Sequence, residues 1–368
     1  MTTAFISDEK TFWHGGGNYA FMLPVGGLVQ PMAAGGLPEN PETKRRLKNL
    51  MQVTGLIDEL AQPQAAPATR ADLERVHTAE YLDDFKRLSD AGGGELGRRT
   101  PFGPGGYDIA ALSAGITMTA VQRVLDGTYS NAYALSRPPG HHCLPDFPNG
   151  FCLLANIAIA VEAAKAAGQV EKVAILDWDV HHGNGSEAIF YDRNDVLTIS
   201  FHQDSNYPPD TGAVADRGRG AGEGFNLNVP LHAGGGHTAY LHAMDRIALP
   251  AIRAFEPDLI IVACGFDAAV VDPLSSMLAT VETFRAMTLR IKTLAQEVCG
   301  GKLVLAHEGG YSEVYVPFCG HATIAALAGS EIDAGDPFLE PFTARQPNAK
   351  FDAFLKSEID DIAREFGL

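Results

Sequence analysis

The 368-residue chain has few cysteines, no long apolar run and no N-terminal targeting pattern. Its five cysteines are widely spaced and form no CxxC pair, which argues against a disulfide framework and against a zinc site built from thiolates. The first residues, MTTAFISDEK, have neither the basic nor the apolar stretch of a secretion signal. Apolar stretches such as FCLLANIAIAV are too short to span a bilayer. These absences predict a cytoplasmic protein without a membrane partner.

Basic side chains are scarce as well. The chain has 28 Lys and Arg residues against 45 Asp and Glu residues, a net charge of −17. Because such a surface repels phosphates and anionic lipids, we expect neither nucleic acid nor a membrane as a partner. The charge weakly favours cationic substrates such as lysine side chains or polyamines. The 46% of hydrophobic residues is normal for a soluble globular protein with a sizeable core.

The second half of the chain alternates short apolar segments with polar turns and helical segments. This pattern is typical of a parallel sheet covered by helices on both faces. No linker or internal repeat interrupts the chain, so we predict one domain over residues 1–368. Strands are expected at 131–135, 172–177, 196–201, 258–266 and 302–310. Helices are expected at 70–88, 108–125, 186–192, 237–255, 281–299 and about 350–366.

Polar side chains follow five of these strands, at the edge where ligands gather in a parallel α/β sheet. Alternate side chains of an extended segment share a face, so Asp179 and His181 can point at one metal ion. Asp267, which follows an entirely apolar strand, is a natural third ligand. A catalytic Zn²⁺ site uses three such nitrogen and oxygen ligands and leaves one position open. The polar residues at the strand ends are His141, His142, Asp177, Asp179, His181, His182, Ser200, His202, Asp267 and Tyr311.

A purely structural role is the alternative to metal binding for these residues. A lone D-x-H triplet occurs often by chance, and a buried Asp–His pair can simply satisfy a core. Two HH dipeptides, D-x-D-x-H-H, a strand-terminal Asp and EGGY in compatible places make coincidence a poor explanation. Histidines expected on helix surfaces or in loops, without a partner, are His77, His232, His237, His242 and His321, whereas His202 and His307 stay undecided.

The motifs RPPGHH, GFC, DWDVHHGNG, ISFH, GFDA and EGGY occur in this order between residues 10 and 330. Together they resemble the histone deacetylase/acetylpolyamine amidohydrolase superfamily, and within it the bacterial class II-like histone deacetylase-like amidohydrolases. The resemblance implies the arginase/deacetylase fold, a three-layer α/β/α arrangement with a central, mostly parallel sheet of about eight strands. It also implies a zinc-dependent amidohydrolase that removes acetyl or other acyl groups from acylated lysine or a related amine.

The resemblance assigns roles to individual residues. His142 acts as general base and then as general acid, while His141 is oriented by the buried carboxylate of Asp177. Tyr311 donates its hydroxyl to the substrate carbonyl oxygen as negative charge develops there. Some relatives have His at this position and are weak deacetylases, so the tyrosine favours an active enzyme. The single zinc ion is held by Asp179, His181 and Asp267.

Two further residues lie behind these groups. In some relatives an aspartate two residues after the second HH pair orients the second tandem histidine, and this chain has Asn184 there. A neutral partner leaves His142 less basic, which is compatible with a general base. His182 is expected to support the site without binding the metal.

The resemblance also implies one or two potassium ions. The first site, behind the zinc, is formed largely by backbone carbonyls and maps to Asp177, Asp179, His181, Ser200 and Phe201. The second maps to Phe190, Arg193, Val196 and Phe225. Carbonyl ligands leave almost no pattern in a sequence, so an ordinary helix-to-strand turn explains the second set equally well.

An acyl-lysine tunnel with aromatic walls is the last element that the resemblance implies. Tyr207 stands where Phe is more usual, which makes the tunnel slightly more polar. A loop carboxylate that grips the substrate backbone corresponds to Glu95 or Asp90. The expected tunnel residues are Gly150, Phe151, Tyr207 and, at the rim, Leu274.

Other functions stay open. An acetylpolyamine amidohydrolase uses the same chemistry on small N-acetylated polyamines, and such enzymes usually dimerise. The Gly/Pro-rich segment 14–31 is a candidate rim or oligomer element, so a homo-oligomer of two or four copies is expected. Tyr311 and the complete set of metal ligands argue against a protein that only binds acyl groups without catalysis. An arginase-like enzyme needs further carboxylates for two manganese ions, where this chain has His182 and Gly183.

Overall fold

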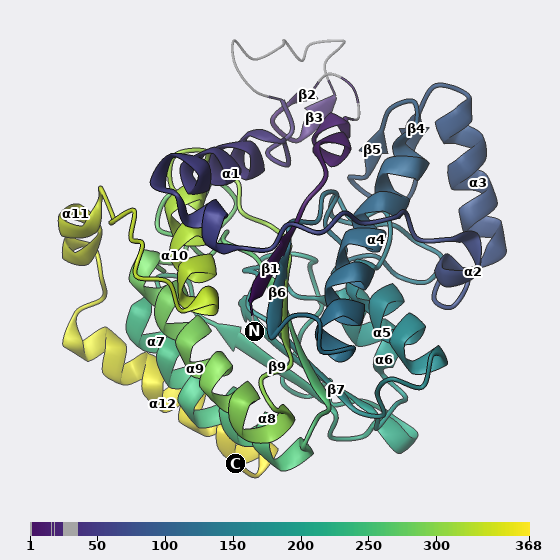
Figure 1. Cartoon of the computed structure of the whole chain (residues 1–368). Helices are drawn as coiled ribbons and strands as arrows, with labels where there is room; N and C mark the ends of the chain where they lie inside the picture. The colour runs from purple at the N-terminus through teal and green to yellow at the C-terminus, as the bar shows by residue number, and fades with distance from the viewer. Residues whose placement is uncertain (1, 16, 18, 25–35) are drawn as a thin grey trace.

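The computed structural model describes residues 2–15, 17, 19–24 and 36–368 (Figure 1). Its centre is a seven-stranded sheet in which every strand pairs in parallel with its neighbours. The strands, in spatial order, are β1 (Thr3–Ile6), β6 (Asn131–Ala134), β11 (Leu303–His307), β10 (Leu259–Cys264), β7 (Val173–Asp177), β8 (Val196–Gln203) and β9 (Asn226–Leu231). The expected three-layer α/β/α fold is confirmed.

Helices cover both faces of this sheet (Figure 1). Alternate residues of each strand enter different cores: Ile260 and Val262 of β10 pack in one, and Ile261 in the other. One face is covered by α1 (Glu42–Thr54), α7 (His237–Ala243), α8 (Leu249–Phe255), α9 (Val281–Cys299), α10 (Val316–Ala328) and α12 (Ala349–Phe366). The other carries α2 (Arg70–Leu73), α3 (Ala79–Asp90), α4 (Gly106–Leu125), α5 (Asn156–Ala166) and α6 (Asn184–Phe190).

Smaller elements complete the described chain. Two-stranded antiparallel ribbons are formed by β2 with β3 and by β4 with β5. None of the helices in the described ranges is long and apolar enough to cross a membrane. The bounds are β2 (Tyr19–Ala20), β3 (Leu23–Pro24), β4 (Gly94–Glu95), β5 (Pro101–Phe102), α11 (Leu339–Ala344), and short turns at Glu9–Trp13, Leu56–Glu59, Gly220–Gly222 and Met244–Ala248.

The sheet differs from the expectation of about eight strands. Seven strands are found in the described part of the chain, and the two at its edges, β1 and β9, were not expected. Their sequences explain this, because TAFI is short and NLNVPL contains asparagine and proline. Pro230 lies in the outermost strand, where a missing backbone N–H is tolerated.

Two expected helices are interrupted. The segment 70–88 divides into α2 and α3, because Thr78 begins a new helix by accepting a hydrogen bond from the Tyr81 backbone N–H. The segment 237–255 contains a wider π-type turn at Met244–Ala248. Pro250 follows this turn at the start of α8, where it has no backbone N–H to contribute to the helix.

Two histidines that we expected at the surface are buried. The Nε2 atom of His321 lies 2.8 Å from Thr54 Oγ1. His77 joins two loops, because its Nδ1 lies 3.1 Å from the Pro145 carbonyl oxygen and its Nε2 accepts a 3.0 Å hydrogen bond from the Ala155 N–H. Helical periodicity placed His77 on the surface of the expected helix 70–88, whereas His321 lies in α10, where no helix was expected. The other three, His232, His237 and His242, are half-buried. Contrary to the expectation, each has a polar neighbour, namely Glu358, Thr283 and Asp360.

His77 predicts a pH-dependent contribution to stability. Burial lowers its pKa from 6.5 to about 4. Because the unfolded chain takes up the proton first, the contribution is complete above pH 6.5 and disappears as the pH falls towards 4. A shift of this size corresponds to about 3 kcal/mol. Urea unfolding of His77→Gln between these pH values should show a shallower loss of stability than wild type. Equal slopes for the two proteins would show that the burial of neutral His77 does not cause the loss.

Candidate active site

The carboxyl ends of β7 and β10 bring the three expected metal ligands together. Asp179 and His181 follow β7, Asp267 follows β10, and these strands are neighbours in the sheet. His181 Nδ1 lies 3.1 Å from Oδ1 of Asp179 and 3.0 Å from Oδ2 of Asp267. All three side chains are buried, and their ligand atoms lie within 4.8 Å of one another.

The chemistry of this triad fits a divalent cation. Burial and the charge of Asp179 raise the pKa of Asp267 to about 6, because two carboxylates face each other away from water. Burial alone would lower the pKa of His181, but the carboxylates of Asp267 and Asp179 outweigh it and raise the pKa to about 10. A cation among these atoms would offset the two negative charges. One imidazole with two carboxylates is a ligand set that Zn²⁺ accepts.

Backbone groups fix the two carboxylates. The Val180 N–H donates to Asp267 Oδ1 at 2.8 Å, and the Gly309 N–H donates to Asp179 Oδ2 at 2.7 Å. A Cβ atom on Gly309 would lie only 2.1 Å from Asp267 Oδ2. The EGGY segment therefore needs glycine at this position, because any side chain would displace a candidate ligand.

The tandem histidines lie beside the triad, each with a different partner. His141 Nδ1 is 2.9 Å from Asp177 Oδ2, and His142 Nδ1 is 2.8 Å from Asn184 Oδ1. The amide oxygen of Asn184 accepts a hydrogen bond, so Nδ1 of His142 carries the proton and its Nε2 is left to accept one. The structure thus brings together the four residues that the sequence placed in these pairs.

The two tandem histidines have pKa values displaced in opposite directions. Burial opposes protonation of His141, but the carboxylates of Asp179 and Asp177 outweigh it and hold its pKa well above the usual value. Burial, followed by the charges of His141 and His181, holds the pKa of His142 well below the usual value. Such a separation is typical of an acid/base site and leaves His142 as the neutral base.

Tyr311 completes the arrangement opposite the tandem histidines. Its ring lies 5.8 Å from that of Phe151 and 6.4 Å from that of His181, measured between centroids. Burial, and then the charge of Asp267, raises the pKa of its hydroxyl well above 10, so the hydroxyl stays a donor. Its backbone N–H donates to Asp272 Oδ2 at 2.7 Å. Asp272 was not expected from the sequence, although it lies only two residues before the expected rim residue Leu274.

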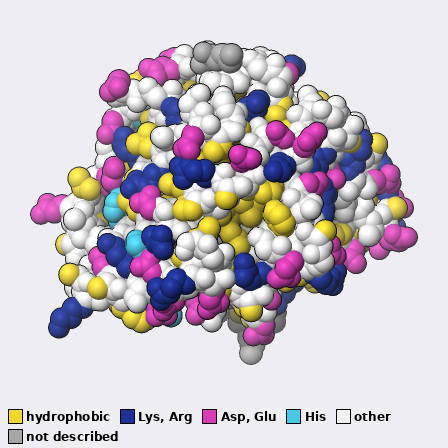
Figure 2. Space-filling model, turned by 90° about the horizontal axis from the view of Figure 1, so that it is seen from below, with side chains coloured by type: hydrophobic (Ala, Val, Ile, Leu, Met, Phe, Trp, Pro, Cys, Tyr) yellow, Lys and Arg dark blue, Asp and Glu magenta, His cyan; other side chains and the backbone are white. Residues whose placement is uncertain are grey.

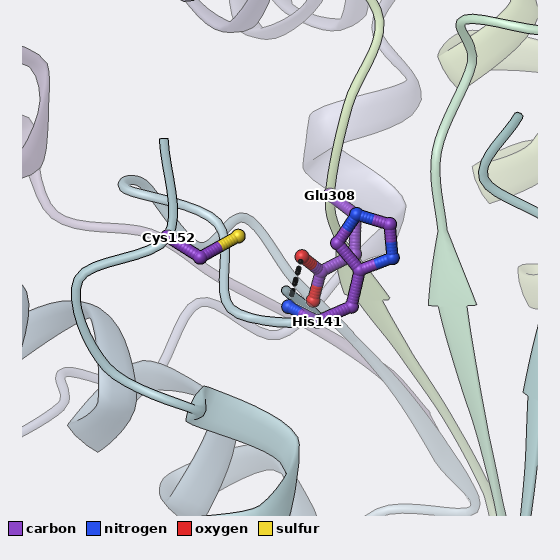
Figure 3. Close-up of side chains that lie close together, drawn as sticks. All are labelled: His141, Cys152 and Glu308. Atoms are coloured by element: carbon purple, nitrogen blue, oxygen red, sulfur yellow. Dashed lines mark hydrogen bonds between the residues drawn. The ribbon is translucent and has the colours of Figure 1, made fainter. Parts of the chain in front are cut away.

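Glu308 is a second residue that the sequence reasoning missed. Figure 3 shows its carboxylate directed at the backbone nitrogen of His141. Its Oε2 accepts hydrogen bonds from the N–H groups of Gly140 at 2.7 Å and His141 at 3.1 Å, and burial raises its pKa to about 7. Its position, directly after the apolar strand LVLAH, was the available signal.

His141, Cys152 and Glu308 also place potential ligand atoms within 4.8 Å of one another (Figure 3). Burial raises the pKa of the Cys152 thiol well above its usual range, which disfavours the thiolate that a metal would need. The Cys152 sulfur accepts the His142 N–H at 3.5 Å. Because these groups already hold the tandem-histidine loop, the cluster fits a structural support better than a second metal site.

A cavity of about 390 Å³ leads from the surface to the triad. His142, His181 and Tyr311 form its inner end. The expected wall residues all line it, namely Gly150, Phe151, Tyr207 and Leu274. Lining residues that the sequence reasoning did not name as such are Phe21, Met22, Arg98, Arg99, Asn206 and Pro209.

The expected loop carboxylate is not part of this cavity. Glu95 accepts the Thr100 N–H at 3.3 Å, and Asp90 pairs with Lys86 on α3. Neither side chain lines the cavity in the described chain. Both acids are exposed, and a contact of either one with the substrate backbone stays a prediction. Of the segment 14–31, residues 21 and 22 line the cavity, whereas 16, 18 and 25–31 lie outside the described residues.

The residues assigned to the first potassium ion lie at the ends of β7 and β8. Asp177 pairs with Ser200 across the two strands, and Phe201 is buried beside them. Ser200 Oγ lies 3.0 Å from Nδ1 of His202. His182, also nearby, places Nδ1 3.0 Å from Thr211 Oγ1 and so does not point at the triad.

The residues assigned to the second ion lie around the turn from α6 to β8. The Phe190 carbonyl accepts the Arg193 N–H at 3.0 Å, and the Phe225 carbonyl accepts the Thr198 N–H at 2.9 Å. Val196 begins β8. These contacts also occur in an ordinary turn, so the second site stays a prediction.

Known proteins share this fold and sequence. The histone deacetylase domain family matches residues 37–327. Over 366 residues the chain is 56% identical to the histone deacetylase-like amidohydrolase of Pseudomonas aeruginosa, covering 100% of this chain and 96% of that protein. It is 36% identical over 336 residues to the probable deacetylase of Archaeoglobus fulgidus, covering 89% and 92%. The crystal structure of the HDA15 HD domain has a TM-score of 0.83 at 32% identity, covering 99% of this chain and 95% of that one.

The parallel sheet between two helical layers, with acids and histidines at its carboxyl edge, defines the α/β fold of the deacetylase and arginase type. Within this class, the chain belongs to the histone deacetylase family. The family places it among enzymes of the deacetylase/amidohydrolase kind.

Proposed function

We propose that the protein is a zinc-dependent amidohydrolase that removes acetyl or other acyl groups from acylated lysine or a related amine. The observation that carries this proposal is the buried triad of Asp179, His181 and Asp267 at the inner end of a cavity, close to His142 and Tyr311. One zinc ion per chain is proposed there, with one or two structural potassium ions behind it. A zinc ion in this position supplies Lewis acidity to water and to the amide carbonyl.

Three side chains carry out proton transfer and charge stabilisation beside the metal. His142, neutral and with Nε2 free to accept, takes a proton from the attacking water and returns it to the nitrogen of the leaving amine. His141, protonated beside Asp177, provides a fixed positive charge next to this proton transfer. Tyr311 donates its hydroxyl to the carbonyl oxygen as that oxygen becomes negative. His142 and Tyr311 are both buried at the inner end of the cavity, where charge interactions are stronger than in water.

The other candidate functions have less support. A non-catalytic acyl-binding protein needs neither a neutral base nor a protonated phenol beside the metal ligands. A second divalent ion of the arginase type would need carboxylates where His182 and Gly183 stand. A homo-oligomer of two or four copies stays a prediction.

A turnover panel with chelation tests the proposal. Wild-type protein should release acetate from an acetyl-lysine peptide, and removal of metal by a chelator should reduce kcat/KM by at least about a hundredfold. Zn²⁺ added after the chelator is removed should restore the rate. Longer acyl-lysines, N-acetylputrescine and N-acetylspermidine measured in parallel would identify the acyl group and the carrier. Turnover that survives chelation, or no turnover of any of these amides, would contradict the proposed function.

A further inference from the structure

The mouth of the cavity carries two unpaired positive charges. Arg98 and Arg99 are exposed, and both line the cavity. Their guanidinium carbons lie 5.7 and 5.1 Å from the centre of the Tyr207 ring, which forms one wall. No carboxylate of the described chain forms an ion pair with either, and the residues outside the described ranges include no Asp or Glu.

The backbone holds these arginines at the mouth. The Arg98 N–H donates to the Pro148 carbonyl at 3.1 Å, and the Arg98 and Arg99 carbonyls accept the N–H groups of Gly150 and Phe151 at 3.0 and 2.9 Å. Three backbone hydrogen bonds therefore hold residues 98–99 against residues 148–151, which include the tunnel-wall residues Gly150 and Phe151. Arg99 has a φ of 58°, a left-handed conformation that is uncommon for a residue with a side chain. Such strain is typical of functional segments.

The cavity lining includes Arg98 and Arg99, although the net charge of the chain is −17. Figure 2, which views the molecule from below, shows acidic and basic side chains interspersed on that face. Because interactions between exposed charges are screened beyond about 10 Å at ordinary ionic strength, Arg98 and Arg99, which line the cavity, act more strongly on a ligand there than distant acids do. The lining of the cavity contains no Asp or Glu.

The position of the charges identifies the part of the substrate that they would meet. The scissile amide has to lie between His142 and Tyr311 at the inner end. An acetyl group is small enough to stay there, so the amine side of the amide extends towards the mouth. An arginine fork matches the geometry of a carboxylate, whereas a second ammonium group would be repelled.

We infer that Arg98 and Arg99 select substrates whose amine portion carries a carboxylate at the tunnel mouth. This inference rests on the proposed function and narrows it to acyl-lysines that have a free α-carboxylate or acidic neighbours. It disfavours acetylated polyamines, whose amine portion is cationic, although the net charge of the chain alone favours them.

Two matched pairs of acetyl-lysine compounds test the inference. The first pair is Nα-benzoyl-Nε-acetyl-lysine and its carboxamide, and the second is a capped acetyl-lysine peptide flanked by Glu or by Gln. The carboxylate member of at least one pair should have a kcat/KM about tenfold higher, mainly through KM. The pair that responds identifies the source of the carboxylate. High salt should reduce the preference.

Three double variants assign the preference to the arginines. Arg98→Gln with Arg99→Asn should bring the ratio close to one, with asparagine chosen because it tolerates the left-handed backbone. Arg98→Lys with Arg99→Lys should keep most of the preference for the carboxylate compound. This variant separates the effect of positive charge from the effect of arginine packing on the Tyr207 ring. Arg253→Gln with Arg364→Gln, on helices α8 and α12, removes the same net charge elsewhere and should leave the preference unchanged.

Calorimetric binding of the same compounds to Tyr311→Phe separates this inference from the proposed function. Selective binding that the Arg98→Gln/Arg99→Asn changes abolish, without turnover in wild type, would support the inference and contradict the amidohydrolase. Turnover with equal kcat/KM within both pairs would support the amidohydrolase and overturn the inference. A preference for the carboxylate compound that persists in Arg98→Gln/Arg99→Asn would also overturn the inference.

Discussion

Asp267→Ala is expected to abolish stable metal binding and to reduce kcat/KM by about a thousandfold or more, because the metal contributes several kcal/mol to the transition state. The variant leaves Asp179 and His181 as the only triad members, and two protein ligands are fewer than a catalytic zinc site uses. Elemental analysis of the purified variant should find zinc well below one ion per chain, whereas wild type should contain about one. The exposed Asp245→Ala serves as the control and should keep both metal and activity.

Thermal unfolding separates the loss of metal from a loss of folding. A ligand that binds only the folded state raises its stability, so chelation should lower the Tm of wild type and leave that of Asp267→Ala unchanged. Full zinc content in Asp267→Ala, or a Tm that still responds to the chelator, would show that Asp267 is not a ligand.

The sheet and the inner end of the site were largely predictable from the sequence. The strands β7, β8, β10 and β11 are near-continuous apolar runs, and a polar residue that stands out against the run ends or closely follows each strand. The rule that ligands gather at the carboxyl edge then selects Asp179, His181 and Asp267. Their contact depends on β10 lying next to β7, and that order is a property of the packed sheet, not of residue spacing.

Residues that act through backbone contacts were not predictable in the same way. Glu308 acts on the N–H groups of Gly140 and His141, far from it in the chain, and such an acceptor has no characteristic spacing. The position of the arginines at the mouth depends on backbone hydrogen bonds between residues 98–99 and 148–151. Both segments are irregular, so their pairing has no pattern in the sequence. His77 looked exposed because helical periodicity continues through it, although the helix breaks there.

Tyr311→Phe is expected to keep the metal and to lose most of the turnover. The change removes one hydroxyl and leaves the ring, so packing against Phe151 and the hydrogen bond from the Tyr311 N–H to Asp272 persist. Removing one donor from a site of developing negative charge typically reduces kcat by about 10²–10³-fold. We expect a loss of this size in kcat with little change in KM, because the donor acts mainly in the transition state.

Tyr207→Phe is the matched control in the same cavity. The Tyr207 hydroxyl donates to Asn149 Oδ1 in the cavity wall, so its removal should change kcat by less than about tenfold. Zinc content should equal that of wild type in both variants, since neither tyrosine belongs to the triad. If Tyr311→Phe retains full kcat, or loses no more than Tyr207→Phe, the hydroxyl of Tyr311 does not stabilise the oxyanion. Stabilisation of the negative charge would then have to come from the metal and from His141, whose Nε2 lies 3.7 Å from Asp179 Oδ1.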